Sequence, residues 1–254
     1  AFNVVSTLVY GPTELLLVDA QFRMSDGKRV ADKIAATGRR LTAIFITHPD
    51  EDHSLGAQAI LARFPGTPVY MTAAAVEDFA RSSPAFLKMA RGYLKDDAPD
   101  SIVQPRPIPS NHFKVDGEDV EVVPDLQGDV IARTNSFLYI PSMSAVIAGD
   151  IVFSGVHPYL AHSTEATRAE WQNSLGRIEA FHPRYVVPGH KRSIEQPDTR
   201  ESLTFMSKYL RDFDAARLTA ANPEALIGAM RTKYPDLGMP LLLVMSSRSA
   251  FAPK

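Results

Sequence analysis

The chain has 254 residues, of which 45% are hydrophobic and 22% are charged, values ordinary for a soluble globular protein with a sizeable core. Its formal net charge of −2 and the lack of a long basic run argue against a nucleic-acid binder, which would carry a basic stripe. Cysteine is absent, which excludes disulfides, thiolate metal ligands and a cysteine nucleophile. No window approaches the roughly 18 consecutive apolar residues of a membrane span, so we expect no membrane partner.

The chain begins at Ala1 rather than at methionine. A removed signal peptide and a trimmed sequence both account for this start, and the lack of cysteine is compatible with either compartment. We therefore expect a cytoplasmic or a periplasmic location, and the choice between them stays open.

Strands and helices alternate along the first half of the chain. The pattern predicts strands at 2–10, 14–18, 41–46 and 67–71, and helices at 26–37, from about 54, and at 73–98. The sequence Gly11-Pro12-Thr13 predicts a turn between the first two strands. Pro84 is expected to interrupt the last helix.

The second half follows a proline-broken loop at 105–110. It predicts strands at 118–123, 136–140, 145–148 and 185–187, and helices at 166–180, 201–220 and 223–233, with a late apolar run at 241–245. Two β-rich layers with helices outside them predict an α/β fold, an αββα four-layer sandwich. We expect this domain to span residues 1–200, and a mainly helical extension at 201–254 to pack on it.

The segment after the strand at 41–46 is dense in metal-binding groups. It contains His48, Asp50, Glu51, Asp52 and His53, two imidazoles and three carboxylates in six residues. In open α/β sheets, ligands bind outside the carboxyl ends of the strands. Because so many carboxylates would repel one another without a cation, the segment predicts a metal site.

Two later strands also end in a candidate ligand. Gly149-Asp150 follows the strand at 145–148, and Gly189-His190 follows the strand at 185–187. The glycines allow the backbone to come close to an ion. Imidazole and carboxylate ligands suit zinc, and also iron(II) or manganese, so we expect one or two divalent ions.

This constellation resembles the metallo-β-lactamase superfamily of hydrolases over roughly residues 1–195. The family signature is His-x-His-x-Asp-His, then a further His, then Gly-Asp, then Gly-His. The resemblance implies that Asp52, His53, Asp150 and His190 are the ligands of the second metal site, and that Asp150 bridges the two metals. It also implies that His48 is the first ligand of the first site.

The first site departs from the family pattern. Asp50 stands where the family has its second histidine. Counting back from Ile140 places Ile131 at the position of the third histidine, whereas Asp129 takes this role if the loop carries a small insertion. Fewer imidazoles should weaken zinc binding and favour harder ions, so we expect the second site to be the better occupied.

The resemblance implies a metal-dependent hydrolase that uses a metal-bound hydroxide on a small ester, lactone, thioester or amide. Asp52 would orient the water or transfer its proton. In the loop after Asp150, His157 and Tyr159 are candidates to bind substrate or a developing oxyanion, and a structural hydrogen bond is the alternative for His157. Lys191 would attract a substrate carboxylate or face water.

A non-catalytic relative is the alternative function. It would keep the sandwich and bind a ligand or a metal without hydrolysis, and the two missing family histidines favour it. We expect a small-molecule substrate in the first case, while its identity and the oligomeric state stay open.

Overall fold

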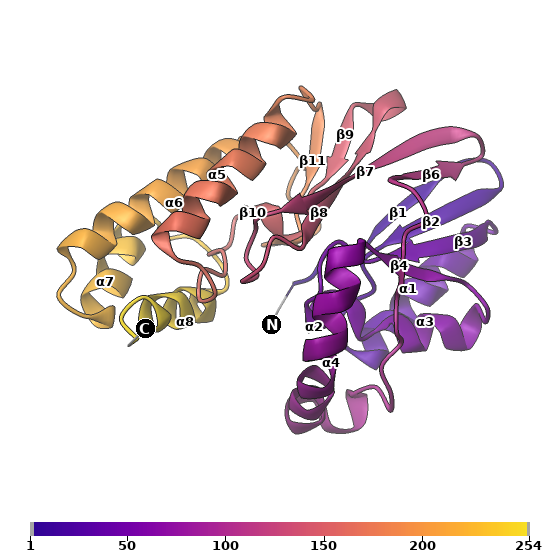
Figure 1. Cartoon of the computed structure of the whole chain (residues 1–254), viewed down its shortest axis with the longest axis horizontal. Helices are drawn as coiled ribbons and strands as arrows, with labels where there is room; N and C mark the ends of the chain where they lie inside the picture. The colour runs from indigo at the N-terminus through magenta and orange to yellow at the C-terminus, as the bar shows by residue number, and fades with distance from the viewer. Residues whose placement is uncertain (1–2, 253–254) are drawn as a thin grey trace. The chain divides into compact units, whose positions relative to one another are not determined.

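The computed structural model describes residues 3–252, which divide into two compact units (Figure 1). The N-terminal unit comprises residues 4–125 and 136–142. The C-terminal unit comprises residue 3 with 126–135 and 143–252. Both units contain strands and helices, so the chain is mixed α/β.

A five-stranded sheet of order β1-β2-β3-β4-β5 forms the centre of the N-terminal unit. Its strands are β1 (Thr7–Tyr10), β2 (Glu14–Val18), β3 (Arg40–Phe45), β4 (Val69–Met71) and β5 (Arg106–Pro107). β1 and β2 are antiparallel, and the other pairs are parallel. Leu15, Leu16, Leu17 and Val18 are all buried, which is the continuous apolar pattern of a strand covered on both faces.

Different partners cover the two faces of this sheet. The helices of the unit are α1 (Met24–Ala36), α2 (Glu51–Ser54), α3 (Ala57–Arg63) and α4 (Ala73–Leu94), followed by the 3₁₀ turn η1 (Lys95–Asp97). Leu17 shares one buried apolar cluster with Ile34 of α1 and Ile60 of α3. On the opposite face, Phe45 packs edge-on against Phe113, with 5.6 Å between the ring centroids.

Phe113 belongs to a β-hairpin that is attached to the first sheet by hydrogen bonds. β6 (His112–Val115) and β7 (Glu118–Leu126) are antiparallel, and β8 (Asn135–Ile140) lies beside β7. The hairpin turn Asp116-Gly117 has positive φ at both positions, as a type I′ turn requires. The Asp116 carboxylate accepts hydrogen bonds from the backbone N–H groups of Thr13 at 2.8 Å and Glu14 at 2.9 Å, which fixes the hairpin to the β1–β2 turn.

The C-terminal unit combines short parallel strands with long helices. β9 (Ala145–Ile147) pairs with β11 (Tyr185–Val187), and β10 (Phe153–Ser154) pairs with β12 (His190–Lys191). The 3₁₀ turns η2 (Pro141–Met143) and η3 (Gly149–Ile151) flank β9, and the helices are α5 (Glu165–Glu179), α6 (Glu201–Thr219), α7 (Pro223–Lys233) and α8 (Pro240–Ser249). Trp171 of α5 is fully buried and donates from Nε1 to the Ile151 carbonyl at 2.9 Å, which anchors α5 to the turn after β9.

The predicted helices and strands match the structure in most places, with several differences. The first predicted strand, at 2–10, is shorter in the structure, where β1 begins at Thr7, and β6 is a strand that the sequence did not predict. Pro84 does not interrupt its helix, since α4 continues through this position. Buried residues on both sides of the proline, Phe79 and Ala90, pack the helix against the interior and outweigh the local effect of the proline. The apolar run at 241–245 lies in α8. Phe2, the first residue of the first predicted strand, lies outside the described residues.

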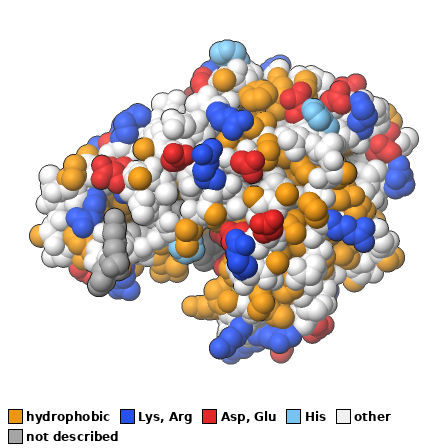
Figure 2. Space-filling view, viewed as in Figure 1, with side chains coloured by type: hydrophobic (Ala, Val, Ile, Leu, Met, Phe, Trp, Pro, Cys, Tyr) orange, Lys and Arg blue, Asp and Glu red, His pale blue; other side chains and the backbone are white. Residues whose placement is uncertain are grey.

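Charged side chains are mixed over the surface. On the face seen in Figure 2, lysine and arginine are interspersed with aspartate and glutamate, as expected for a chain of formal net charge −2. Among residues 3–252, no helix combines the length and the apolar character that crossing a bilayer requires.

Candidate metal centre

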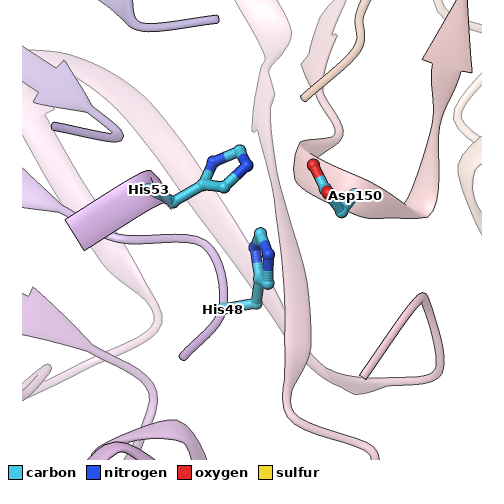
Figure 3. Close-up of side chains that lie close together, drawn as sticks. All are labelled: His48, His53 and Asp150. Carbon is cyan, nitrogen blue, oxygen red and sulfur yellow. The ribbon is translucent and has the colours of Figure 1, made fainter. Parts of the chain in front are cut away.

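Two buried histidines follow β3 in the N-terminal unit. The strand ends at Phe45, and His48 and His53 then lie on either side of the start of α2 (Figure 3). Both side chains are completely buried, and their ring centroids are 4.4 Å apart. Burying two imidazoles is costly unless their nitrogens are hydrogen-bonded or bound to a ligand, so their partners define the site.

A buried carboxylate fixes the orientation of both rings. Asp19 follows β2 and accepts a hydrogen bond from the Thr47 backbone N–H at 2.8 Å, and it contacts His53 Nδ1 at 3.0 Å. The Thr47 hydroxyl lies 3.0 Å from the same carboxylate and 2.9 Å from His48 Nδ1. Since these contacts engage Nδ1 of each ring, Nε2 is the nitrogen that can bind a metal, the arrangement that carboxylate–histidine pairs commonly give to metal ligands.

Each Nε2 faces a carboxylate of the same segment. His48 Nε2 lies 3.9 Å from Asp50 Oδ2, and His53 Nε2 lies 3.9 Å from Asp52 Oδ2. Burial, and next the nearby charge of Asp52, raise the pKa of Glu51 to about 7. Burial, and to a smaller extent repulsion from Asp52, therefore oppose the ionisation of Glu51, and a nearby cation would favour it.

The Gly-Asp and Gly-His segments meet in the C-terminal unit. Because β9 and β11 are parallel neighbours, Asp150 and His190 leave the same end of the two strands. Asp150 Oδ2 lies 3.1 Å from His190 Nε2, and His190 Nδ1 contacts the Asn3 carbonyl at 3.2 Å. The ring of Phe153 stacks on His190 with 5.1 Å between centroids.

Gly189 makes this close approach possible. A Cβ atom at this position would lie 1.9 Å from Asp150 Oδ1, far inside van der Waals contact. The carboxylate therefore occupies space that any other residue would fill. The sequence predicts a small residue beside each ligand, and at Gly189 a larger residue would clash with the Asp150 carboxylate.

The loop between β7 and β8 contains the two alternatives for the third ligand of the first site. Asp129 is 1% exposed, whereas Ile131 is 72% exposed and offers no ligand atom. The side chains that could hold a metal ion include His48, Asp50, Asp52, His53, Asp129, Asp150 and His190. The six metal ligands expected from the sequence are among these side chains, as is Asp129, the alternative third ligand of the first site, and their role as ligands stays a prediction.

The predicted helper residues lie in different surroundings. His157 is 2% exposed and shares a hydrogen bond of 2.8 Å with the hydroxyl of Tyr209 in α6. Tyr159 is half-buried, with its hydroxyl 3.3 Å from His162 Nε2. Lys191 neither faces water nor keeps its ammonium group available, because it is buried and donates to Asp198 at 2.9 Å.

Asp19 and Thr47 are the residues of this site that the sequence did not reveal. Asp19 follows the apolar run Leu15-Leu16-Leu17-Val18, and an acidic residue directly after a buried strand is the sequence feature that could have indicated its role. Its φ of 61° lies in the left-handed region, which aspartate adopts more readily than most residues but which no pattern in this sequence specifies. That conformation turns the carboxylate back toward the end of β3.

The sequence model of the metallo-β-lactamase superfamily matches residues 1–190 of this chain. The chain belongs to this superfamily. No curated protein matches its sequence. The superfamily includes many hydrolases, and its fold implies a bound divalent metal.

Solved structures of the superfamily share the fold. The metallo-β-lactamase family protein TTHA1429 from Thermus thermophilus is 17% identical, with a TM-score of 0.66 over 97% of this chain and 86% of that one. VMB-1 is 19% identical, with a TM-score of 0.62 over 83% and 85%. The metallo-β-lactamase from Pontibacter korlensis is 18% identical, with a TM-score of 0.58 over 82% and 87%. The predicted fold class, α/β of the metallo-β-lactamase type with C-terminal helices, is confirmed. The division into domains at residue 200 stays a prediction.

Replacing Asp19 by asparagine should destabilise the N-terminal unit. The amide keeps one acceptor but turns an NH₂ group toward Thr47 and His53, so we expect Asp19→Asn to lower the free energy of unfolding by about 2 kcal/mol. Urea unfolding of chelator-treated protein measures this change. The control Asp32→Asn removes a carboxylate that is 69% exposed and should change stability by less than about 0.5 kcal/mol. Equal effects of the two variants would contradict this role of Asp19.

The stability of the protein should depend on the ionisation of His157. Burial and, to a smaller extent, the charge of Arg231 lower the pKa of His157 from 6.5 to about 4. The unfolded chain therefore takes up a proton near pH 6.5 that the folded chain accepts only near pH 4, so stability is lost as the pH falls through this window.

The variant His157→Asn keeps a polar partner for Tyr209 but does not titrate. We expect its free energy of unfolding to fall less steeply than that of the wild type between pH 6.5 and pH 4. The exposed control His112→Asn should follow the wild-type curve. A wild-type slope in the His157→Asn variant would refute the assignment.

Proposed function

We propose that this chain is a metal-dependent hydrolase of a small ester, lactone, thioester or amide. The observation that carries the proposal is the set of buried imidazoles and carboxylates at strand ends, with Asp19 fixing both histidines that follow β3. Membership of the metallo-β-lactamase superfamily supports the view that these side chains hold a divalent metal.

The residues present fit a divalent ion. Imidazole nitrogens and carboxylate oxygens are the ligands that zinc, iron(II) and manganese share. Gly189 leaves room for the Asp150 carboxylate, which occupies the space that a side chain at this position would fill. The Nδ1 contacts of His48, His53 and His190 favour Nε2 as the metal-binding nitrogen of each ring. Zinc is the first candidate ion, with one or two ions per chain.

A bound divalent ion supplies an activated water at neutral pH and polarises a carbonyl oxygen. The chain then has to orient this water, accept its proton and assist the carbonyl. Asp52 suits the first two tasks, since its side chain is 15% exposed and lies 3.9 Å from His53 Nε2. Tyr159 suits the third, as its half-buried hydroxyl can donate to a developing oxyanion. The burial of His157 against Tyr209 favours a supporting role for this residue.

Metal analysis combined with a substrate panel tests the proposal. After dialysis the protein should retain divalent metal and should hydrolyse at least one ester, lactone, thioester or amide. A chelator should abolish the activity, and added zinc or manganese should restore it. Undiminished activity in metal-free protein would refute the proposal.

The same panel tests a non-catalytic function. Asp50, at the position of the family's second histidine, favours this alternative because a carboxylate-rich position is a weaker zinc site. Retained metal without turnover of any substrate class would support a ligand-binding protein instead.

Enlarging Gly189 should weaken metal binding. A methyl group here would displace the carboxylate of Asp150, so we expect Gly189→Ala to lower metal affinity by about 10-fold or more. Metal content after equilibrium dialysis measures the effect. The control Gly176→Ala adds a methyl group in α5 that meets nothing within 4 Å, and it should keep the wild-type metal content. Full metal content in Gly189→Ala would contradict the placement of the ion beside Asp150.

A further inference from the structure

The outer side of α4 presents an apolar groove to solvent. The helix buries Phe79 and Ala90 against the interior of the N-terminal unit, and the groove lies on another side of it. The groove has a volume of about 470 Å³ and is lined by residues from the second half of the helix: Ala85, Lys88, Met89, Gly92 and Tyr93. Tyr93 is 78% exposed, although its ring would be more stable out of water. An exposed group of apolar side chains of this kind indicates an interaction surface.

The first turn of α4 carries short side chains in line with the groove. Ala74 precedes Gly92 by 18 residues, which is five full turns of an α-helix, so the two lie on the same side. Ala73 is exposed and Ala74 is half-buried. The first turn therefore offers a small apolar surface, whereas the last turns offer a groove and the large ring of Tyr93.

Two exposed charges of opposite sign lie on this side of the helix. Glu77 and Lys88 are 11 residues apart, close to three turns, so they lie on the same side of α4 at a spacing of about 16 Å. At that distance they do not pair with each other. Within residues 3–252 neither takes part in an ion pair, whereas the neighbouring Asp78 is paired with Arg81 at 3.1 Å. Each charge is therefore available to a partner outside the chain.

We propose that α4 is the interface between two copies of this chain, which pair antiparallel through this face about a two-fold axis near residues 82 and 83. Glu77 of each copy then lies opposite the partner's Lys88. The first turn of each helix, with Ala73 and Ala74, enters the groove of the other. The proposal is independent of the hydrolase function, because it uses none of the candidate metal ligands.

A second copy fits this face because the face is complementary to itself. One half of α4 supplies the groove and a positive charge, and the other half supplies small apolar side chains and a negative charge. An antiparallel pair brings unlike halves together, and a two-fold axis makes each of these contacts twice. A parallel pair would place the Glu77 side chains of both copies beside each other. The short side chains also allow the two helices to approach closely.

Charge reversal tests this arrangement. Sedimentation velocity of the full chain over a dilution series measures the dissociation constant of the dimer. Glu77→Lys or Lys88→Glu places like charges opposite each other twice, so each single variant should raise this constant by about 10-fold or more. Glu77→Lys combined with Lys88→Glu restores unlike charges and should return the constant to within about 3-fold of the wild-type value. This recovery cannot arise from misfolding. The control Lys28→Glu reverses an exposed charge of α1 and should leave the constant unchanged.

Cross-linking tests where the two copies meet. Because the chain has no cysteine, Ala85→Cys introduces a single thiol beside the proposed axis. A short bismaleimide should then link the two copies covalently, which a denaturing gel shows as a band of twice the mass. The control Ala229→Cys places its thiol on the exposed surface of α7 and should give no such band at the same protein concentration.

The outcomes decide the proposal without metal or substrate. A wild type that is monomeric throughout the dilution series would refute it. A dimer that survives both single charge reversals, or that Ala85→Cys does not cross-link, would place the contact elsewhere and refute it as well. Failure of the combined variant to recover would refute the pairing of Glu77 with the partner's Lys88.

Discussion

The buried carboxylate of Asp19 is the contact on which the candidate metal ligands of the N-terminal unit depend. It accepts hydrogen bonds from Thr47, contacts His53, and through the Thr47 hydroxyl reaches His48. These residues come from the ends of β2 and β3, which are parallel neighbours in the sheet. The apolar core that aligns the two strands therefore also aligns the polar side chains at their ends.

Close approach of backbone and side chain recurs where the candidate ligands lie. Gly56 follows α2, and a Cβ there would lie 2.2 Å from the Ala20 carbonyl. Gly128 and Gly189 make the corresponding room for Asn135 and Asp150. In all three places the missing side chain is what permits a polar group to sit in a defined, water-poor position. Glycine beside a ligand is therefore part of the chemistry of the site as well as of its turns.

The sequence predicted the elements with strong periodicity and the residue types of the site, but it could not predict the contacts that orient them. Strand ends supplied His48, Asp150 and His190, because a buried apolar run followed by a polar residue is visible in the sequence. The continuous helix through Pro84 was missed, since tertiary packing outweighed a local rule. The role of Asp19 depends on a left-handed backbone conformation that no sequence pattern specifies.

The hydrogen bonds of Asp19 also bear on how an ion would be taken up. Both imidazoles of the N-terminal unit are already oriented in the folded chain, so metal binding there need not freeze their rotamers. Preorganisation of this kind reduces the conformational entropy lost when the metal binds, and the affinity for the metal is correspondingly higher. The orientation of His48 and His53 is thus set during folding, before any cation binds.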